Sequence, residues 1–227
     1  MSVAPETFRN NLFPEINATL EFRGLTYVFF EQFSLPTAEQ LDLIQSTLPG
    51  WSLITWGWWN DDADIEDQDI EGITEEGDSF EDFSEENQTV ALTTFGLNAE
   101  GLPLGDRQLQ PIDTAAELEQ IFPEGGNWGL VAISCPNWRT VSACEWRGCM
   151  NVAEPDEMAL TLKKWQDNWG IEALAFGGEE DDADLLVRIP AEHEANLEMY
   201  SALRVAADQV TIFKDDNLGQ LANLWFD

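Results

Sequence analysis

Hydrophobic residues recur with strand-like or helix-like spacing in segments separated by Pro, Gly and acidic residues. Leu41, Ile44 and Leu48 lie on one face of a predicted helix that begins after Pro36 and Thr37, because residues three or four apart share a face. In the first half of the chain the pattern predicts strands near 18–23, 25–33, 51–59 and 89–96, and helices over 37–48 and 114–122, the latter capped by Asp113.

The second half of the chain follows a similar order. Its pattern predicts strands near 128–134, 140–147, 171–176, 184–189 and 209–213, and helices over 155–168, 191–206 and 217–226. Both halves therefore read β-β-α-β-β-α. We expect an α+β fold in which antiparallel sheets carry helices packed on one face.

Four pairs of segments indicate an internal duplication, because they occur in the same order and are separated by 119 to 124 residues. The pairs are EFRGLTYV (21–28) with EWRGCMNV (145–152), PTAEQLDLIQ (36–45) with PDEMALTLKK (155–164), Gly50 with Gly170, and DDADI (61–65) with DDADL (181–185). We expect two repeat lobes, residues 1–124 with an acidic connection at 61–88, and residues 125–227, which meet at EGGN (124–127).

Charge sets this sequence apart. Ten basic residues face 44 acidic ones, for a net charge of −34. Such a chain repels nucleic acid and anionic membranes and attracts basic surfaces or cations. Residues 61–86 hold 14 of the acids and no Lys or Arg, while Ile70, Ile73, Phe80 and Phe83 interrupt them as candidate apolar anchors. The segment is too charged to bury, so we expect a long connection between strands.

The spacing of these acids is comparable with that of phosphates. If 61–86 were helical, its 14 charges would lie about 2.8 Å apart along about 39 Å, and about 6 Å apart if extended. A nucleic-acid strand carries a phosphate about every 3.4 Å. The second DDAD segment adds related acids in the other half. The predicted partner-binding residues are Asp61, Asp62, Asp64, Glu66, Asp67, Asp69, Glu71, Glu75, Glu76, Asp78, Glu81, Asp82, Glu179, Glu180, Asp181, Asp182 and Asp184.

Signatures of catalysis are missing from the sequence. His193 is the single histidine, and no GxSxG, GxxxxGK[ST] or HExxH motif occurs. The three cysteines are an odd number without paired metal-ligand spacing, so we expect buried, reduced side chains. The ten tryptophans are expected to serve mainly in packing. We expect no enzymatic activity and no cofactor.

Calcium is an alternative ligand for part of the acidic run. Residues 67–78 place acids at positions 1, 3, 5, 9 and 12 of a twelve-residue loop, with Gly72 at position 6, as in an EF-hand. Asp78 stands where a bidentate Glu belongs, and strand-like flanks replace the expected helices. The alternative metal ligands are Asp67, Asp69, Glu71 and Asp78.

These observations predict a cytoplasmic, non-catalytic acidic protein that occupies the basic site of a nuclease or of a DNA- or RNA-binding protein, as an inhibitor or immunity-type nucleic-acid mimic. Direct contact with nucleic acid is not expected, because the chain is strongly negative. Contact with a membrane is not expected, since no run of 18 apolar residues occurs, and no secretory signal is found. The alternatives are an interaction or structural protein whose acidity serves solubility or salt adaptation, and the calcium-binding protein.

Overall fold

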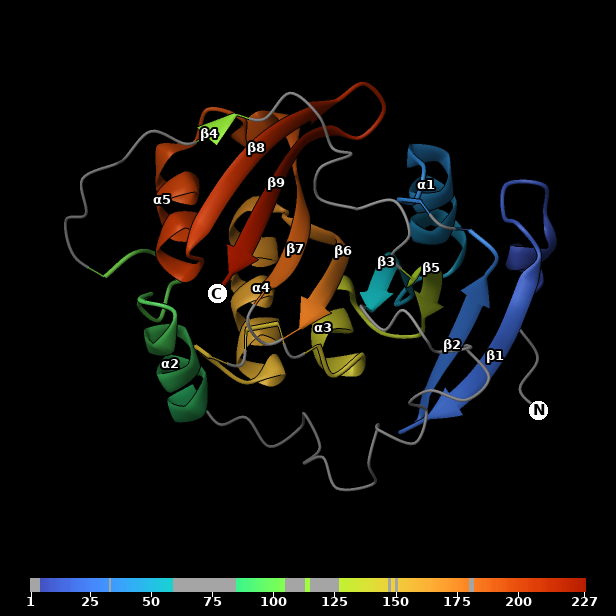
Figure 1. The fold of residues 1–227 in the computed structure, drawn as a ribbon, viewed down its shortest axis with the longest axis horizontal. Helices are drawn as coiled ribbons and strands as arrows, with labels where there is room; N and C mark the ends of the chain where they lie inside the picture. Colours follow the sequence, from blue (N-terminus) through green and yellow to red (C-terminus); the bar gives the residue numbers. More distant parts are fainter. Residues whose placement is uncertain are drawn as a thin grey trace.

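The computed structural model describes residues 5–32, 34–58, 85–104, 113–114, 127–146, 148–149, 151–179 and 182–227. Within these residues one sheet runs through the molecule in the order β1-β2-β5-β3-β6-β7-β9-β8-β4 (Figure 1). The strands are β1 (Ile16–Phe22), β2 (Leu25–Phe30), β3 (Ser52–Trp58), β4 (Asp113–Thr114), β5 (Asn127–Ile133), β6 (Glu172–Glu179), β7 (Asp182–Ile189), β8 (Gln209–Asp215) and β9 (Gly219–Phe226).

Most neighbouring strands in this sheet are antiparallel, which confirms the predicted α+β class. Two pairs are parallel: the short β4 beside β8 at one edge, and β3 beside β6 in the middle. In the central pair Thr55 lies opposite Ala175 and Trp56 opposite Phe176. This central pair joins the β1-β2-β5-β3 part of the sheet to the β6-β7-β9-β8-β4 part.

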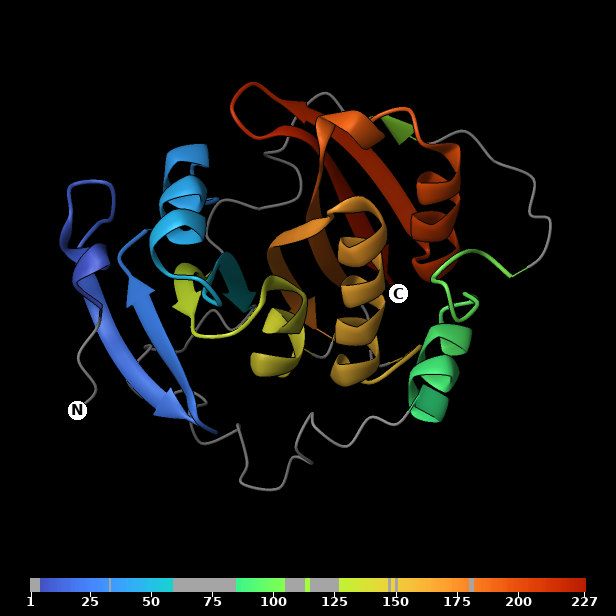
Figure 2. The same cartoon turned by 180° about the vertical axis from the view of Figure 1, so that it is seen from behind.

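Helices cover both faces of the sheet, so the prediction of helices on one face was wrong. Leu53 and Ile54 are consecutive in β3 and point to opposite faces. Leu53 packs in one buried cluster with residues of α1, whereas Ile54 packs in another with residues of α2, α4 and α5; Figure 2 shows α4 in front of the sheet. The α-helices are α1 (Ala38–Thr47), α2 (Glu85–Thr94), α3 (Thr140–Ala143), α4 (Pro155–Trp169) and α5 (Leu197–Ala206), and the 3-10 helices are η1 (Glu6–Arg9), η4 (Asn137–Arg139) and η5 (Ala191–His193).

Helices α1 and α4, which the sequence predicted, both begin with a pair of reciprocal capping hydrogen bonds. In α1 the Thr37 side chain accepts from the backbone N–H of Gln40, whose own side chain accepts from the backbone N–H of Thr37. Glu154 and Glu157 form the same arrangement in α4, with Pro155 in the first turn. Both ends satisfy backbone donors that a helix leaves unpaired, which explains why these helices were predictable.

The strand predicted at 89–96 is wrong, because these residues belong to α2 and the turn after it. Ala91, Leu92 and Phe95 are buried, and Phe95 follows Leu92 by three residues and Ala91 by four, which is the spacing of a helical face. Val90 and the neighbouring threonines are typical of strands, yet Val90 is exposed. Packing of α2 against α4 therefore outweighs the local strand preference.

Two further predictions about elements were wrong. The predicted strand 140–147 forms α3 and a turn, in which Thr140, Val141 and Cys144 are buried. The predicted helix 217–226 is mostly strand β9, which lies between β7 and β8. Its Leu218, Leu221 and Leu224 recur every three residues like a helix, but a strand buried on both faces shows no polar alternation.

Within the described residues the order of strands and α-helices is β-β-α-β-α-β in the first half and β-α-α-β-β-α-β-β in the second, so the predicted order β-β-α-β-β-α is wrong for the second half. Asp113 and Thr114 form β4, so Thr114 does not begin the predicted helix; residues 115–122 lie outside the described part. The helix predicted at 191–206 is divided into η5 and α5. Residues 124–126 of the predicted seam also lie outside the described residues, so the two-lobe division stays a prediction. Strand β5, which follows that seam, is hydrogen-bonded between β2 and β3.

Among the helices that the structure describes, none combines the length and the apolar character needed to cross a membrane.

Candidate acidic binding surface

The parallel pairing of β3 with β6 determines where the two acidic stretches of the chain leave the sheet. The first stretch follows Trp58, the last residue of β3, and the second begins at Glu179, the last residue of β6. Trp56 lies opposite Phe176, so both strands end on the same side of the sheet. In Figure 1 the arrowheads of β3 and β6 lie close together and point toward the lower side of the picture.

Further acids occupy the same side in the neighbouring strands. Glu179 is the register partner of Asp182 in β7, and Ala183 pairs with Phe226, next to Asp227. Asp208 immediately precedes β8, whose first residue Gln209 pairs with Trp225. We name this set the acidic edge. It consists of Glu179, Asp182, Asp184, Asp208 and Asp227.

Hydrogen bonds fix part of the acidic edge. Asp184 Oδ1 accepts from Asn223 Nδ2 at 2.5 Å. Asp208 Oδ2 accepts from the backbone N–H of Asp227 at 3.1 Å, and the backbone N–H of Asp208 donates to Trp225 O at 3.0 Å. Asp208 and Asp227 are exposed, and Asp184 is half-buried. The Asp184 and Asp208 carboxylates are thus each held by a hydrogen bond on this side of the sheet.

The width of this surface follows from the strand order. From β3 to β8 the sheet passes through β6, β7 and β9, and neighbouring strands lie about 4.8 Å apart, so the side spans about 19 Å. The strand ends that form it contain no Lys or Arg at 56–58, 127–128, 177–179, 182–184, 208–209 and 225–227. Carboxylates on these strand ends attract cationic surfaces and repel anionic ones.

The predicted partner-binding residues divide into two groups. Glu179, Asp182 and Asp184 lie together on the acidic edge, as described above. The others lie outside the described residues: Asp61, Asp62, Asp64, Glu66, Asp67, Asp69, Glu71, Glu75, Glu76, Asp78, Glu81, Asp82, Glu180 and Asp181.

The sequence did not reveal Asp208 and Asp227 as members of this surface. Each is an isolated acid in sequence, and they join the others only because β8 and β9 pair beside β7. The prediction of a helix at 217–226 hid the position of Asp227, because it placed Asp227 after a helix instead of at the end of strand β9.

The alternative calcium ligands Asp67, Asp69, Glu71 and Asp78 lie outside the described residues. Within the described part of the chain, no group of three or more His, Cys, Asp or Glu residues is placed to hold a metal ion. His193 lies in η5 with Nδ1 3.4 Å from Asn196 Nδ2, and it is half-buried.

Three cysteines were predicted to be buried and reduced, and the structure confirms this. Cys135, Cys144 and Cys149 are free and buried. Burial raises the pKa of the Cys135 and Cys149 thiols to about 12 and that of Cys144 well above its usual value. The prediction that tryptophans serve in packing holds for three of them in and near α4, since Trp146, Trp165 and Trp169 are buried.

Comparison of the chain with protein-family models, curated proteins and solved structures gives no match.

Proposed function

We propose that this chain is a non-catalytic acidic binding protein that occupies the basic site of a nuclease or of another nucleic-acid-binding protein, as an inhibitor or immunity-type mimic. The observation that supports the proposal is the central pairing of Trp56 with Phe176. In the sequence the acidic run begins directly after β3, and the acids at 179–184 begin at Glu179, the last residue of β6. Because β3 and β6 end on the same side of the sheet, we propose that a single partner contacts both acidic stretches.

The chemistry of such a contact is that of phosphate recognition. A protein groove that binds nucleic acid carries Lys and Arg at the spacing of phosphates, and ligand binding there releases counterions. Carboxylates attached to strand ends are fixed by the sheet, as Asp184 and Asp208 are. A rigid array loses little conformational entropy on binding, which favours affinity over that of a flexible polyanion.

Internal duplication remains part of the proposal. Helix α1 is followed by Gly50 and β3, and helix α4 by Gly170 and β6. The register of β3 with β6 separates partners by 120 residues, which is also the separation of DDADI (61–65) and DDADL (181–185). The matched segments 21–28 and 145–152 differ in structure. Residues 21–28 span the β1–β2 hairpin, whereas 145–152 begins in the turn after α3.

The test compares two variants with equal changes in net charge. The edge variant replaces Glu179, Asp182, Asp208 and Asp227 by Lys; the control variant replaces Glu31, Asp42, Glu100 and Glu192, which are exposed on other elements. Each is titrated against purified basic nucleases and DNA-binding proteins in a DNA-competition assay, with poly-glutamate as a polyanion of no fixed shape. A third variant with Lys at 61, 62, 64, 67 and 69 examines the other acidic stretch.

We expect the wild type to displace DNA from at least one of these proteins, with affinity falling steeply as salt rises. The edge and 61–69 variants should lose at least tenfold in affinity, and the control variant less than threefold. Equal losses in the edge and control variants would show that total charge, and not its placement, governs binding. Competition no better than that of poly-glutamate would contradict the mimic role.

A second candidate function has its own supporting observation. Exposed acids also occur outside the acidic edge, such as Glu31, Asp42 and Glu192. Ion pairs such as Arg23–Glu145, Lys163–Asp167 and Arg188–Glu172 occur, but ten basic residues cannot each neutralise the 44 acids. This distribution favours an interaction or structural protein whose acidity maintains solubility in a saline cytoplasm. A proteome of similar acidity in the source organism would support that alternative.

A further inference from the structure

A cavity of about 260 Å³ opens at the other end of β3 and β6, between α1, η4 and the first residues of the two strands. It lies away from the acidic edge, because β6 runs from Glu172 to Glu179, a length of about 23 Å. Much of its wall is apolar. The apolar side chains include Leu41, Ile44, Leu48, Trp51, Leu53 and Leu174.

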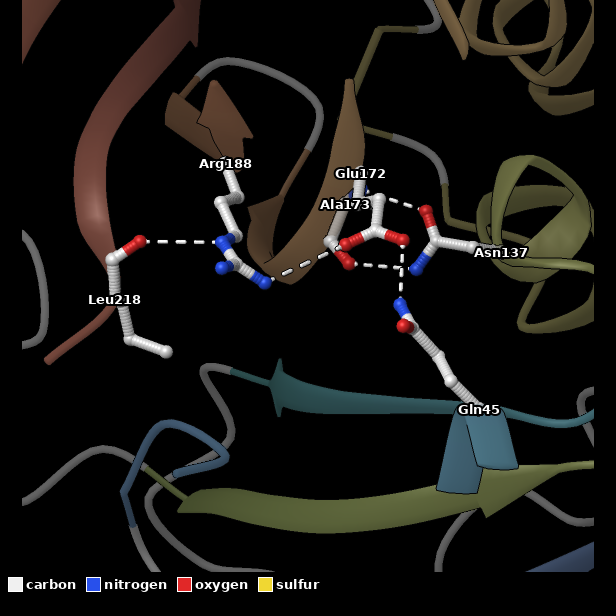
Figure 3. A network of polar contacts seen from close by, with 6 residues as sticks. All are labelled: Gln45, Asn137, Glu172, Ala173, Arg188 and Leu218. Atoms are coloured by element: carbon white, nitrogen blue, oxygen red, sulfur yellow. Dashed lines mark hydrogen bonds and ion pairs between the residues drawn. The ribbon is translucent and has the colours of Figure 1, made fainter. Parts of the chain in front are cut away.

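Glu172 supplies a carboxylate to this apolar cavity. Its Oε1 accepts from Gln45 Nε2 at 2.9 Å, and its Oε2 lies 3.8 Å from Arg188 Nη1 (Figure 3). Arg188 is turned toward the β8–β9 hairpin, where its Nε donates to Leu218 O at 3.1 Å. A carboxylate accepts about four hydrogen bonds, so Glu172 retains capacity for a donor that enters the cavity.

The wall around Glu172 is held in place by Asn137 of η4. Its Nδ2 donates to Ala173 O at 2.8 Å, and its Oδ1 accepts from the Ala173 backbone N–H at 2.7 Å (Figure 3). The register of β6 with β7 shifts between Ala173 and Ala175. Such bulges redirect side chains and are frequent beside binding sites. The carboxylate is therefore presented by a fixed segment of backbone.

The electrostatic environment favours a positive ligand. Burial raises the pKa of Glu172 and Asp42 adds to this, whereas Arg188 and the hydrogen bond from Gln45 lower it. Burial is the largest effect, so the carboxylate is incompletely compensated by its present partners. A further cation would offset the unfavourable burial of its charge, and the charge of −34 on the chain adds a general attraction for cations.

We propose that this cavity binds a small organic cation that carries a primary ammonium on an apolar body. The ammonium donates to Glu172 and the apolar body packs against Ile44, Leu53 and the other hydrophobic side chains. An ammonium group has three donors, which suits a cavity lined by Glu172 and by the amide side chains of Gln45 and Gln166. The volume lies near the lower limit of ligand pockets, which restricts the ligand to a compact molecule.

The probes for this proposal are phenethylamine, the neutral 2-phenylethanol and the anionic phenylacetate, titrated into the full chain by calorimetry. We expect saturable binding of one phenethylamine per chain, at least tenfold weaker binding of 2-phenylethanol and no binding of phenylacetate. Condensation of cations on the acidic surface is removed by 0.3 M NaCl, whereas a partly buried contact is screened less. The measurement is therefore repeated at that salt concentration.

Glu172→Gln tests the carboxylate, and Glu39→Gln is the matched control because Glu39 is an exposed acid on α1 that does not line the cavity. We expect Glu172→Gln to weaken phenethylamine binding at least tenfold and Glu39→Gln to leave it within twofold. Amide chemical shifts of the wild type locate the ligand independently of any variant. Shifts confined to the acidic edge, or equal binding of phenethylamine and 2-phenylethanol, would overturn the proposal.

Discussion

Cys135, Cys144 and Cys149 are the nucleophilic side chains most affected by their surroundings in the described structure. All three are buried, and burial raises the pKa of two of them to about 12. The thiolate is the reactive form, and each unit of pKa lowers its population about tenfold at neutral pH. In the folded chain they therefore behave as small hydrophobic side chains.

We predict that the native protein at pH 8 reacts with a disulfide reagent such as DTNB at least about 100-fold more slowly than a free thiol, because both access and thiolate population are reduced. All three thiols should react within minutes once guanidinium unfolds the chain. Absorbance at the wavelength of the released thiolate gives both rates. Fast reaction of any cysteine in the folded protein would show that its burial is overcome by local opening.

The sequence predicted single residues well where burial alone determines their role. The burial of the cysteines and of several tryptophans follows from their hydrophobicity, and the acids at 179–184 were recognised from their density. Glu172 was not recognised, because its significance depends on Gln45 from α1 and Arg188 from β7. Partners that are distant in sequence leave no local pattern from which such a site could be inferred.

At the scale of elements, the hydrogen bonds that end α2 show that Gly96 was the residue in the sequence that indicated a helix. The N–H of Leu97 donates to Leu92 O and that of Gly96 donates to Thr93 O, both at 2.9 Å. This pair of bonds is a Schellman motif, which requires a residue of positive φ, usually Gly, after the last helical turn. Gly96 with φ +70° fulfils it, so the glycine after Phe95 was a better guide than the β-branched residues before it.

We predict that Gly96→Ala lowers the free energy of unfolding by about 3 kcal/mol. An Ala at positive φ costs about 1 kcal/mol, and its Cβ would lie 2.5 Å from Val205 Cγ1 of α5, which adds an overpacking cost. Gly50→Ala is the matched control, because its φ is +85° but its Cβ would meet nothing within 4 Å. We expect a loss of about 1 kcal/mol there.

Urea unfolding followed by circular dichroism measures both variants. Adding Val205→Ala to Gly96→Ala should recover part of the loss, because it removes the contacting methyl group. Equal losses for the two glycine variants would mean that α2 and α5 do not approach each other as described.

Elements were predictable when their ends carried their own signals and unpredictable when packing determined them. Pro36 and Thr37 with the spacing of Leu41, Ile44 and Leu48 identified α1, and the match of 155–164 to 36–45 indicated α4. By contrast, β9 has the leucine spacing of a helix and becomes a strand only because β7 and β8 flank it. Neither the central pairing nor the covering of both faces by helices is encoded in a short segment.

At the scale of the whole molecule, self-repulsion among the 44 acids opposes folding. We predict that the free energy of unfolding rises by about 1–3 kcal/mol between 0.05 and 0.5 M NaCl, because the Debye length falls to a few ångströms. Thermal unfolding at a series of NaCl concentrations measures this. Sucrose stabilises by exclusion instead of screening, so it serves as the control.

The shape of that salt dependence distinguishes the two candidate functions. Screening of a locally acidic surface should saturate by about 0.5 M, where the Debye length is already short. A chain adapted to high salt should continue to gain stability beyond 1 M. A decrease in stability with NaCl would contradict both expectations, since it would require net attraction between the charges.

The central pairing of β3 with β6 also has a consequence for biosynthesis. Its strands are 120 residues apart, so joining them closes a long loop at an entropic cost of about 4 kcal/mol, and the ribosome must deliver β6 before the sheet can be completed. Until then one side of β3 offers unpaired backbone groups to any strand of another nascent chain. The carboxylates that follow Trp58 make neighbouring copies repel one another, and in this way they act as gatekeepers against aggregation while the second half is still being translated.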